Sequence, residues 1–260
     1  KINFDVAFIC IHGTPGEDGK LQGYFELIGL PYTTCDVTTS ALTFNKRFTV
    51  AVASMAGIKT ARSLHVIKTE TFKTDEILSQ LKLPLFVKPN NGGSSFGISM
   101  IESPDQLEAA IEKAFIEDDQ IIIEEGIVGR ELTIGVYGSK DALITLPAIE
   151  IVSKNKYFDY NAKYKGESSE ICPAQIDDQL KLYLEQTAKK IYRALLLRGI
   201  CRMDFIYETS SKLLYFLEVN TVPGLTNESL VPKELKAAGI EPVEFYKFLI
   251  NSALEHGSNT

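Results

Sequence analysis

The stretch that decides the fold reads Arg202-Met203-Asp204 in one apolar segment and Glu218-Val219-Asn220-Thr221-Val222-Pro223-Gly224 in the next. Side chains alternate between the two faces of a β-strand. On two adjacent strands, Asp204, Glu218 and Asn220 would therefore share one face with Arg202. Oxygen ligands without His or Cys suit Mg²⁺, which usually binds one or two carboxylates and the phosphates of a nucleotide. The stretch predicts a magnesium–nucleotide site.

The overall composition is that of an ordinary globular protein. Of the 260 residues, 45% are hydrophobic and 23% charged, which suits one large or two ordinary domains. The net charge of −7 argues against a nucleic-acid partner, which needs a basic face. The four cysteines have no metal-type spacing and no apolar run is long enough to span a bilayer. We therefore expect a cytoplasmic protein with reduced thiols and no membrane partner.

Strand and helix patterns alternate along the chain, which predicts an α/β architecture, with α+β lobes. Residues 153–169 lack periodicity and are expected to form a long loop, a form that enzymes often use as a lid. Apolar residues at helical spacing between Ile176 and Leu195 predict one long helix. The other expected strands are 6–11, 83–87, 98–101, 120–125, 130–137 and 142–151, and the other expected helices are 20–29, 45–57, 104–115 and two at the C-terminus.

A glycine–serine loop at residues 90–97 can bind phosphate through its backbone N–H groups. It matches neither the dinucleotide nor the P-loop pattern, and a plain hairpin turn is the commoner meaning of such a loop. Lys88 ends the strand before it and can reach a phosphate as a point charge. Glu124 ends another strand, where a carboxylate can accept ribose hydrogen bonds, although a solvated strand end is the commoner case. Glu131 is equally a candidate ribose ligand or a surface acid.

Several segments together resemble the D-alanine–D-alanine ligases, a peptidoglycan-precursor family of the ATP-grasp superfamily. They follow the family's order over essentially the whole chain, and each is weak alone. The resemblance implies an ATP-grasp fold whose ATP is held between two lobes. The matching segments are His12-Gly-Thr-Pro-Gly-Glu-Asp-Gly19, Leu21-Gln-Gly23, Gly29-Leu-Pro-Tyr32, Lys88-Pro-Asn-Asn-Gly-Gly-Ser-Ser-Phe-Gly97, Phe158-Asp-Tyr-Asn-Ala-Lys-Tyr164, Arg202-Met-Asp204, Glu218-Val-Asn-Thr-Val-Pro-Gly224 and Ser229-Leu-Val-Pro232.

The resemblance also implies a division of the chain and a set of cofactors. Residues 1–40 would be the remnant of an N-terminal Rossmann-like substrate domain, 41–125 the small ATP-grasp subdomain, and 126–260 the catalytic subdomain with its lid at 153–169. The cofactors would be ATP and two Mg²⁺ ions, or Mn²⁺, held by Asp204, Glu218 and Asn220. The implied nucleotide-binding residues are Lys46, Lys88, Ser94, Ser95, Glu124, Glu125, Ile127, Glu131 and Lys163.

The implied reaction joins two D-alanines through an acyl phosphate. Arg202 would neutralise charge on the transferred phosphoryl group, as phosphoryl transfer requires, and would share the later oxyanion with the backbone N–H of Gly224. Tyr164, in a network with Ser94, would favour D-alanine over D-lactate as second substrate; a tyrosine that only packs the lid is the alternative. The residues that would hold the two D-alanines are His12, Lys163, Tyr164, Arg202, Gly224, Ser229 and Leu230.

Two departures from the family pattern affect this interpretation. The family holds the amine of its first D-alanine with a glutamate near the N-terminus, and no segment before His12 supplies it, so we expect upstream sequence. Relatives often carry Lys where this chain has Glu125. Two alternatives stay open: another ATP-grasp carboxylate–amine ligase, forming for example D-alanyl-D-lactate or D-alanyl-D-serine, and a non-catalytic nucleotide-binding fragment. A homodimer is expected from the resemblance alone.

Overall fold

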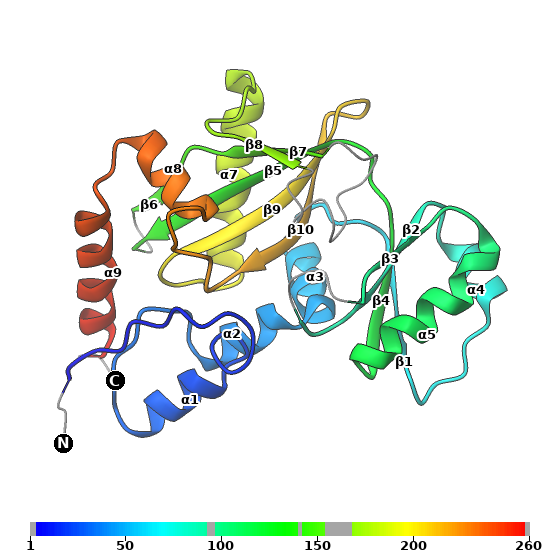
Figure 1. The fold of residues 1–260 in the computed structure, drawn as a ribbon, viewed down its shortest axis with the longest axis horizontal. Coiled ribbons are helices and arrows are strands. Elements are labelled where there is room, and N and C mark those ends of the chain that lie inside the picture. The colour runs from blue at the N-terminus through cyan, green and yellow to red at the C-terminus, as the bar shows by residue number, and fades with distance from the viewer. Residues whose placement is uncertain (1–3, 93–96, 140–141, 154–167, 258–260) are drawn as a thin grey trace.

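A computed structural model describes residues 4–92, 97–139, 142–153 and 168–257. Two antiparallel sheets lie side by side, with the N-terminal segment beneath them (Figure 1). The larger sheet has six described strands in the order β10-β9-β5-β7-β8, with β6 paired to β5. Its strands are β5 (Arg130–Gly138), β6 (Leu143–Thr145), β7 (Ile149–Ser153), β8 (Ser168–Ile171), β9 (Cys201–Glu208) and β10 (Leu213–Asn220).

One face of the larger sheet is closed by helix α7 (Asp178–Ala194), as predicted from its periodicity. Leu180, Leu184, Ala188 and Ile191 are buried and belong to the same apolar cluster as Met203 and Phe205 of β9 and Phe216 of β10. Helices α8 (Leu230–Ala238) and α9 (Pro242–Gly257) pack at the other end of the sheet, against Tyr137. Tyr137 lies on the face opposite α7, so α8 and α9 cover one end of that face and leave the rest of it for polar side chains.

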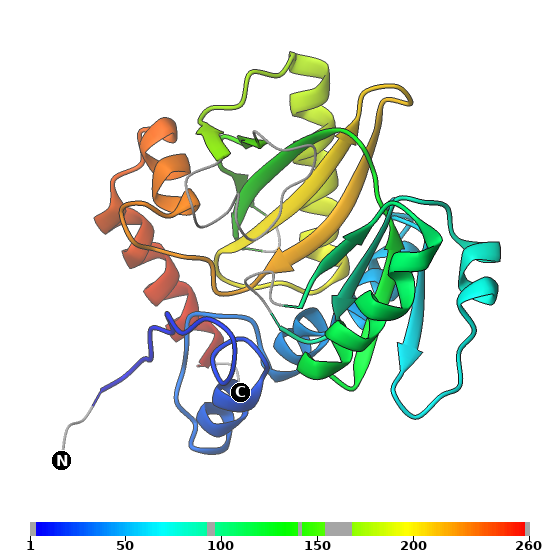
Figure 2. The same cartoon turned by 45° about the vertical axis from the view of Figure 1, so that its right-hand side comes forward.

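The smaller sheet has the strand order β1-β4-β2-β3 and an apolar cluster of its own. Helices α4 (Thr74–Gln80) and α5 (Leu107–Glu117), the latter preceded by the 3₁₀ turn η1 (Pro104–Gln106), supply its apolar cover (Figure 2). The strands are β1 (Ser63–Ile67), β2 (Leu85–Pro89), β3 (Ser99–Ile101) and β4 (Gln120–Glu125). The antiparallel pairing of β2 with β3 confirms the hairpin predicted around the glycine–serine loop.

The N-terminal segment contains three helices, two of which begin at a residue whose side chain caps the first turn. They are α1 (Lys20–Leu27), α2 (Val37–Phe44) and α3 (Lys46–Met55). The Asp36 side chain caps α2 by accepting from Thr39 N at 2.8 Å, and the Asn45 side chain caps α3 by accepting from Phe48 N at 3.1 Å. Such caps satisfy backbone donors that the first helical turn leaves free. Ala53 of α3 joins the apolar cluster of the larger sheet.

Three sequence-based expectations are corrected by the structure. The strand expected at 6–11 forms only an isolated bridge, Ala7 with Tyr32, because the short extended segment 31–33 is its one hydrogen-bonded neighbour among the described residues. The strand expected at 142–151 is two strands, since Pro147 lies between them and lacks the N–H that a ladder needs. The loop expected at 153–169 ends inside strand β8; its residues 154–167 lie outside the described residues.

Candidate active site

The free face of the larger sheet carries the polar residues that the sequence predicts. On β9, Met203 and Phe205 point into the core, so the alternation of side chains turns Arg202 and Asp204 to the opposite face. In the ladders, Asp204 pairs with Thr133 of β5 and Glu218 of β10. Arg202 pairs with Gly135 on one side and Asn220 on the other. The predicted gathering of Arg202, Asp204, Glu218 and Asn220 is present.

A β-bulge at Leu217 is what turns Glu218 toward this face. Phe216 is buried in the core, and strict alternation would send the side chain of Glu218 to that same side. The register shifts between Phe216 and Glu218, so that Phe216 faces Phe205 while Glu218 already faces Asp204. One extra residue in a strand reverses the faces of all residues that follow it. The bulge therefore brings Glu218 and Asn220 to the site.

Asp204 is the centre of a buried hydrogen-bond network. Arg202 donates to both of its oxygens, from Nε at 3.0 Å and from Nη2 at 2.9 Å. The hydroxyl of Thr133 donates to Oδ1 at 2.5 Å, and the amide of Asn220 donates to Oδ2 at 3.3 Å. Burial alone would lower the pKa of Arg202, but the charge and hydrogen bonds of Asp204, helped by Glu218 and Glu234, raise it. Arg202 is thus a permanently charged group held in a fixed orientation.

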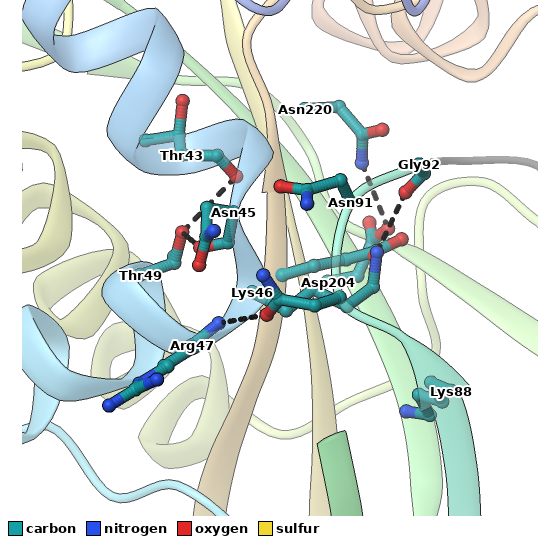
Figure 3. Close-up of polar contacts among 12 residues, drawn as sticks. Thr43, Asn45, Lys46, Arg47, Thr49, Lys88, Asn91, Gly92, Asp204 and Asn220 are labelled. Carbon is teal, nitrogen blue, oxygen red and sulfur yellow. Dashed lines mark hydrogen bonds and ion pairs between the residues drawn. The ribbon is translucent and has the colours of Figure 1, made fainter. Parts of the chain in front are cut away.

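Lys46 approaches this cluster from the first turn of α3 (Figure 3). Its Nζ donates to the carbonyl of Gly92 at 2.7 Å and lies 4.0 Å from Oε2 of Glu218. Helix α3 is tied to the loop that follows β2, because Lys46 N donates to the Asn90 carbonyl at 3.1 Å and Arg47 N to the Asn90 side chain at 2.8 Å. A cavity of about 60 Å³ lies here, with Lys46, Glu218 and Asn220 in its wall.

The smaller sheet presents a second cation on the face opposite its apolar cluster. Val87 and Ile123 belong to that cluster, so Lys88 and Glu124 point to the other side, where they form an ion pair. Glu125 points back to the cluster side, and its carboxylate accepts from Lys82 N at 2.9 Å. Of the two predicted glutamates, only Glu124 therefore shares a face with Lys88. Its neighbour Glu125 has only backbone groups left for a nucleotide.

The loop after β10 meets two of the predicted substrate residues. A Cβ placed on Gly224 would lie 2.5 Å from Ser229 Oγ and 3.7 Å from His12 Nε2, so the backbone here runs close to both side chains. Ser229 stands directly before helix α8, and its hydroxyl is within 2.9 Å of Thr226 Oγ1. Leu230 is the first residue of that helix. The structure therefore brings His12, from the start of the chain, next to the segment that contains Gly224, Ser229 and Leu230.

Glu17 is a residue of this region that the sequence reasoning missed. Its Oε2 accepts from Gly13 N at 2.7 Å and its Oε1 from Val222 N at 3.2 Å, so one carboxylate ties the segment after His12 to the loop after β10. Burial raises the pKa of Glu17, against the opposing effect of the backbone hydrogen bond from Gly13. Glu17 lies in segment 12–19, which is one of the segments that resemble the family. From that segment only His12 was predicted to bind substrate, although the resemblance covers Glu17 as well.

The donor set at Asp204, Glu218 and Asn220 fits a hard cation. Two carboxylates and one amide oxygen lie on one face, next to lysines that suit the phosphates of a nucleotide. No cluster of three or more His, Cys, Asp or Glu side chains suited to a metal is found within the described ranges. Mg²⁺ bound by one or two carboxylates commonly completes its coordination with nucleotide phosphates and water.

Comparison with known families agrees with this geometry. The family model described as "D-ala D-ala ligase C-terminus" matches residues 45–251, and the model "D-ala D-ala ligase N-terminus" matches residues 1–35. The chain belongs to the D-alanine–D-alanine ligase family. The family resemblance inferred from the short motifs is thereby confirmed, as is the expected ATP-grasp fold with mixed α and β lobes.

Curated relatives of this ligase family are similar over nearly the whole chain. The D-alanine–D-alanine ligase of Flavobacterium johnsoniae is 50% identical over 254 residues, which are 98% of this chain and 78% of that protein. The enzyme of the same name from Parabacteroides distasonis is 41% identical over 98% of this chain and 77% of its own length. ATP dependence therefore follows for this chain as a member of the ligase family.

Solved ligase structures superpose closely on the chain. VanG D-Ala:D-Ser ligase from Enterococcus faecalis has a TM-score of 0.89 and 38% identity, covering 97% of this chain and 74% of that one. D-alanine–D-alanine ligase from Bacillus anthracis complexed with ATP has a TM-score of 0.85 and 29% identity, covering 98% and 81%. Both share the two-sheet arrangement described above at the level of the whole fold.

Some predicted ligase residues are placed apart from the Asp204 cluster or lie outside the described ranges. Glu131 lies on β5 two residues before Thr133, on the same face of the sheet, and Ile127 lies in the connection between β4 and β5. Ser94, Ser95, Lys163 and Tyr164 are outside the described residues, and so is most of the predicted lid. Their roles stay predictions.

Proposed function

We propose that this chain joins two D-alanines to D-alanyl-D-alanine with ATP and Mg²⁺, providing a precursor of peptidoglycan. The observation that carries the proposal is the cluster around Asp204. It combines a fixed arginine with oxygen ligands for a cation, and Lys46 faces it from α3. Such a cluster suits phosphoryl transfer, in which catalysis rests on positioning and charge neutralisation. The names of the curated relatives give the substrate class.

Asp204, Glu218 and Asn220 would hold the metal, as one or two Mg²⁺ or Mn²⁺ ions. When bound, the metal would neutralise charge on the ATP phosphates and orient them. Lys46 of α3, 4.0 Å from Glu218, and Lys88 of β2, paired with Glu124, supply further positive charge for the phosphates. The loop with Ser94 and Ser95, together with Lys163, is assigned to the same phosphates by the family pattern, and Glu124, Glu125, Ile127 and Glu131 to adenosine.

Arg202 neutralises the charge that builds up on the transferred phosphoryl group, because its guanidinium is always charged and is held by Asp204. In the second step the amine of the second D-alanine attacks the carbonyl carbon of the acyl phosphate, and the carbonyl oxygen becomes an oxyanion, which the N–H of Gly224 and Arg202 stabilise until phosphate leaves. The first turn of α8, with Ser229 and Leu230, binds the carboxylate of the second D-alanine, since a helix N-terminus offers free N–H donors. His12 contacts the first D-alanine, and Tyr164 closes the site.

The larger organisation is part of the proposal. The proposed domains are residues 1–40, 41–125 and 126–260; within the second, Ala53 of α3 belongs to the apolar cluster of the larger sheet, so α3 connects the small subdomain to that sheet. A homodimer and a cytoplasmic location rest on the family resemblance. In the described part of the chain, no helix is long and apolar enough to cross a membrane.

Phosphate release by the intact chain tests the function. With ATP, Mg²⁺ and D-alanine we expect phosphate release that depends on D-alanine and yields the dipeptide, detected by mass spectrometry. L-Alanine replaces D-alanine in the control. D-Serine and D-lactate are added in competition with limiting D-alanine, because a similar solved structure is a D-Ala:D-Ser ligase. If no dipeptide forms under any condition that includes D-alanine, the proposal is refuted. If D-alanyl-D-serine is the preferred product, the chain is instead a ligase that forms D-alanyl-D-serine.

A further inference from the structure

A buried glutamate outside the predicted site occupies the side-chain space of a glycine on the site face. Glu234 of α8 is fully buried, with 0% of its surface exposed. Its Oε1 accepts a hydrogen bond from Gly135 N at 3.0 Å. A Cβ on Gly135 would lie only 2.6 Å from Oε2 of the same glutamate. Glycine at 135 is therefore what lets this carboxyl group reach the sheet.

The ladder register shows which face of the sheet the carboxyl group reaches. Gly135 pairs directly with Arg202, and directly paired residues on antiparallel strands point to the same face, with Cβ atoms about 5 Å apart. Oε2 of Glu234 therefore lies on the site face, in the row that holds Arg202. The interaction extends to charge, since Glu234 helps to raise the pKa of Arg202.

The other oxygen of this carboxyl group needs an explanation. Within the described part of the chain, Oε2 is buried and has no hydrogen-bond partner. A buried polar atom without a partner is costly, and native proteins keep few of them. This unpaired oxygen lies where the row of Arg202 borders the apolar cluster of Leu146 and Leu235, because a Cβ on Gly135 would lie 2.8 Å from Leu146 Cδ1 as well.

Glu234 also connects Arg202 to the start of α8. Residues four apart lie on one side of a helix, so Glu234 lies beneath Leu230, the first residue of α8. A shift of this carboxyl group would move the first turn of the helix relative to Arg202. The two elements it links are the ones assigned to the second substrate and to the reacting groups.

We infer that Glu234 is a positioning residue that holds Arg202 and the first turn of α8 in register with each other. It touches neither substrate nor nucleotide. The inference rests on the proposed function for its effect on turnover, but the packing of Glu234 beside Arg202 does not depend on that function. Nothing in the short motifs points to Glu234, because its partner is a glycine 99 residues away in the chain.

The kinetic test compares Glu234→Ala with Leu235→Ala. Both shorten a buried side chain of α8, but Leu235 belongs to an apolar cluster that includes Phe245 and Leu249 of α9 and contains no charged side chain. For Glu234→Ala we expect kcat to fall at least about tenfold and the KM for D-alanine to rise, with the KM for ATP within about twofold. Leu235→Ala should lower the melting temperature while kcat stays within about twofold. Equal losses of kcat in the two variants, or an unchanged kcat in Glu234→Ala, would overturn the inference.

A second measurement needs no ligase activity. The shift in melting temperature caused by Glu234→Ala is compared in the wild-type and Arg202→Ala backgrounds, with Leu235→Ala as the control in both. The effects of two substitutions on stability add when the residues are distant and do not add when the residues are in contact. We therefore expect the melting-temperature shift of Glu234→Ala to differ between the two backgrounds by about 2 °C or more. The Leu235→Ala shift should be the same in both. Additive shifts for Glu234 and Arg202 would refute their packing, whereas absent dipeptide formation in the wild type would refute only the proposed function.

Discussion

Thr133→Val is the most informative single substitution for the Asp204 network. Thr133 is buried, with 1% of its surface exposed, and its hydroxyl donates to Asp204 Oδ1 at 2.5 Å. Valine has nearly the same shape but no donor, so the substitution removes one hydrogen bond and leaves the packing of β5 intact. Asp204 keeps its bonds from Arg202 and Asn220. The change therefore isolates one contact to a buried carboxylate.

The magnitude follows from the charge on the acceptor. A hydrogen bond to an ionised group contributes about 1.5–3 kcal/mol to stability. Because three other donor contacts to Asp204 remain, we expect the free energy of unfolding to fall by about 2 kcal/mol. In a protein of this size, that loss corresponds to a melting temperature about 4–8 °C lower. Asp204 is then less firmly oriented, so the Mg²⁺ concentration for half-maximal phosphate release should also rise.

Thr133→Ser provides the matched control. Serine keeps the hydroxyl and loses one buried methyl group, which costs about 1 kcal/mol, so the Mg²⁺ requirement should stay at the wild-type value. Differential scanning calorimetry gives the melting temperatures, and Mg²⁺ titration of phosphate release gives the Mg²⁺ concentration for half-maximal activity. The reasoning is refuted if Thr133→Val melts at the same temperature as the wild type. It is also refuted if Thr133→Ser raises the Mg²⁺ requirement as much as Thr133→Val does.

Four further substitutions test the proposed roles. Arg202→Ala should lower ligation at least about 100-fold while calorimetry still detects ATP binding; near-normal turnover would remove Arg202 from the reaction. Asp204→Asn and Glu218→Gln should each raise the Mg²⁺ needed for activity, and an unchanged titration would exclude that residue as a ligand. Gly224→Ala should raise the KM for D-alanine, because its Cβ would lie 2.5 Å from Ser229 Oγ; an unchanged KM would contradict the close approach.

The site residues that could be predicted from the sequence are those whose spacing within one strand carries the information. Arg202 and Asp204 are two residues apart on β9, so alternation alone places them on one face. The long helix α7 was predictable for the same reason, because its buried residues recur at a fixed period. In both cases the face on which a side chain lies follows from its spacing along one strand or helix. That spacing can be read from the sequence.

The residues that escaped prediction act across long separations. Thr133 meets Asp204, and Glu17 meets Val222, only after strands and loops far apart in the chain have come together. The strand predicted at 6–11 was wrong for a related reason, since a continuous apolar run becomes a strand only where neighbouring strands pair with its backbone groups. The side chains of a segment indicate whether it tends to form a strand or a helix. Which other segment it pairs with is determined only when the whole chain folds.

The bulge at Leu217 shows how a correct prediction can rest on a feature that was not foreseen. Glu218 and Asn220 were expected beside Asp204 from their own spacing, yet the apolar pattern of Leu214 and Phe216, continued without interruption, would bury both of them in the core. The two patterns on β10 are compatible only if one residue is left out of the ladder between them, and Leu217 is that residue. Conflicting faces within one strand therefore indicate a bulge, and in this chain the bulge brings Glu218 and Asn220 to the face of Asp204, where the metal is proposed to bind.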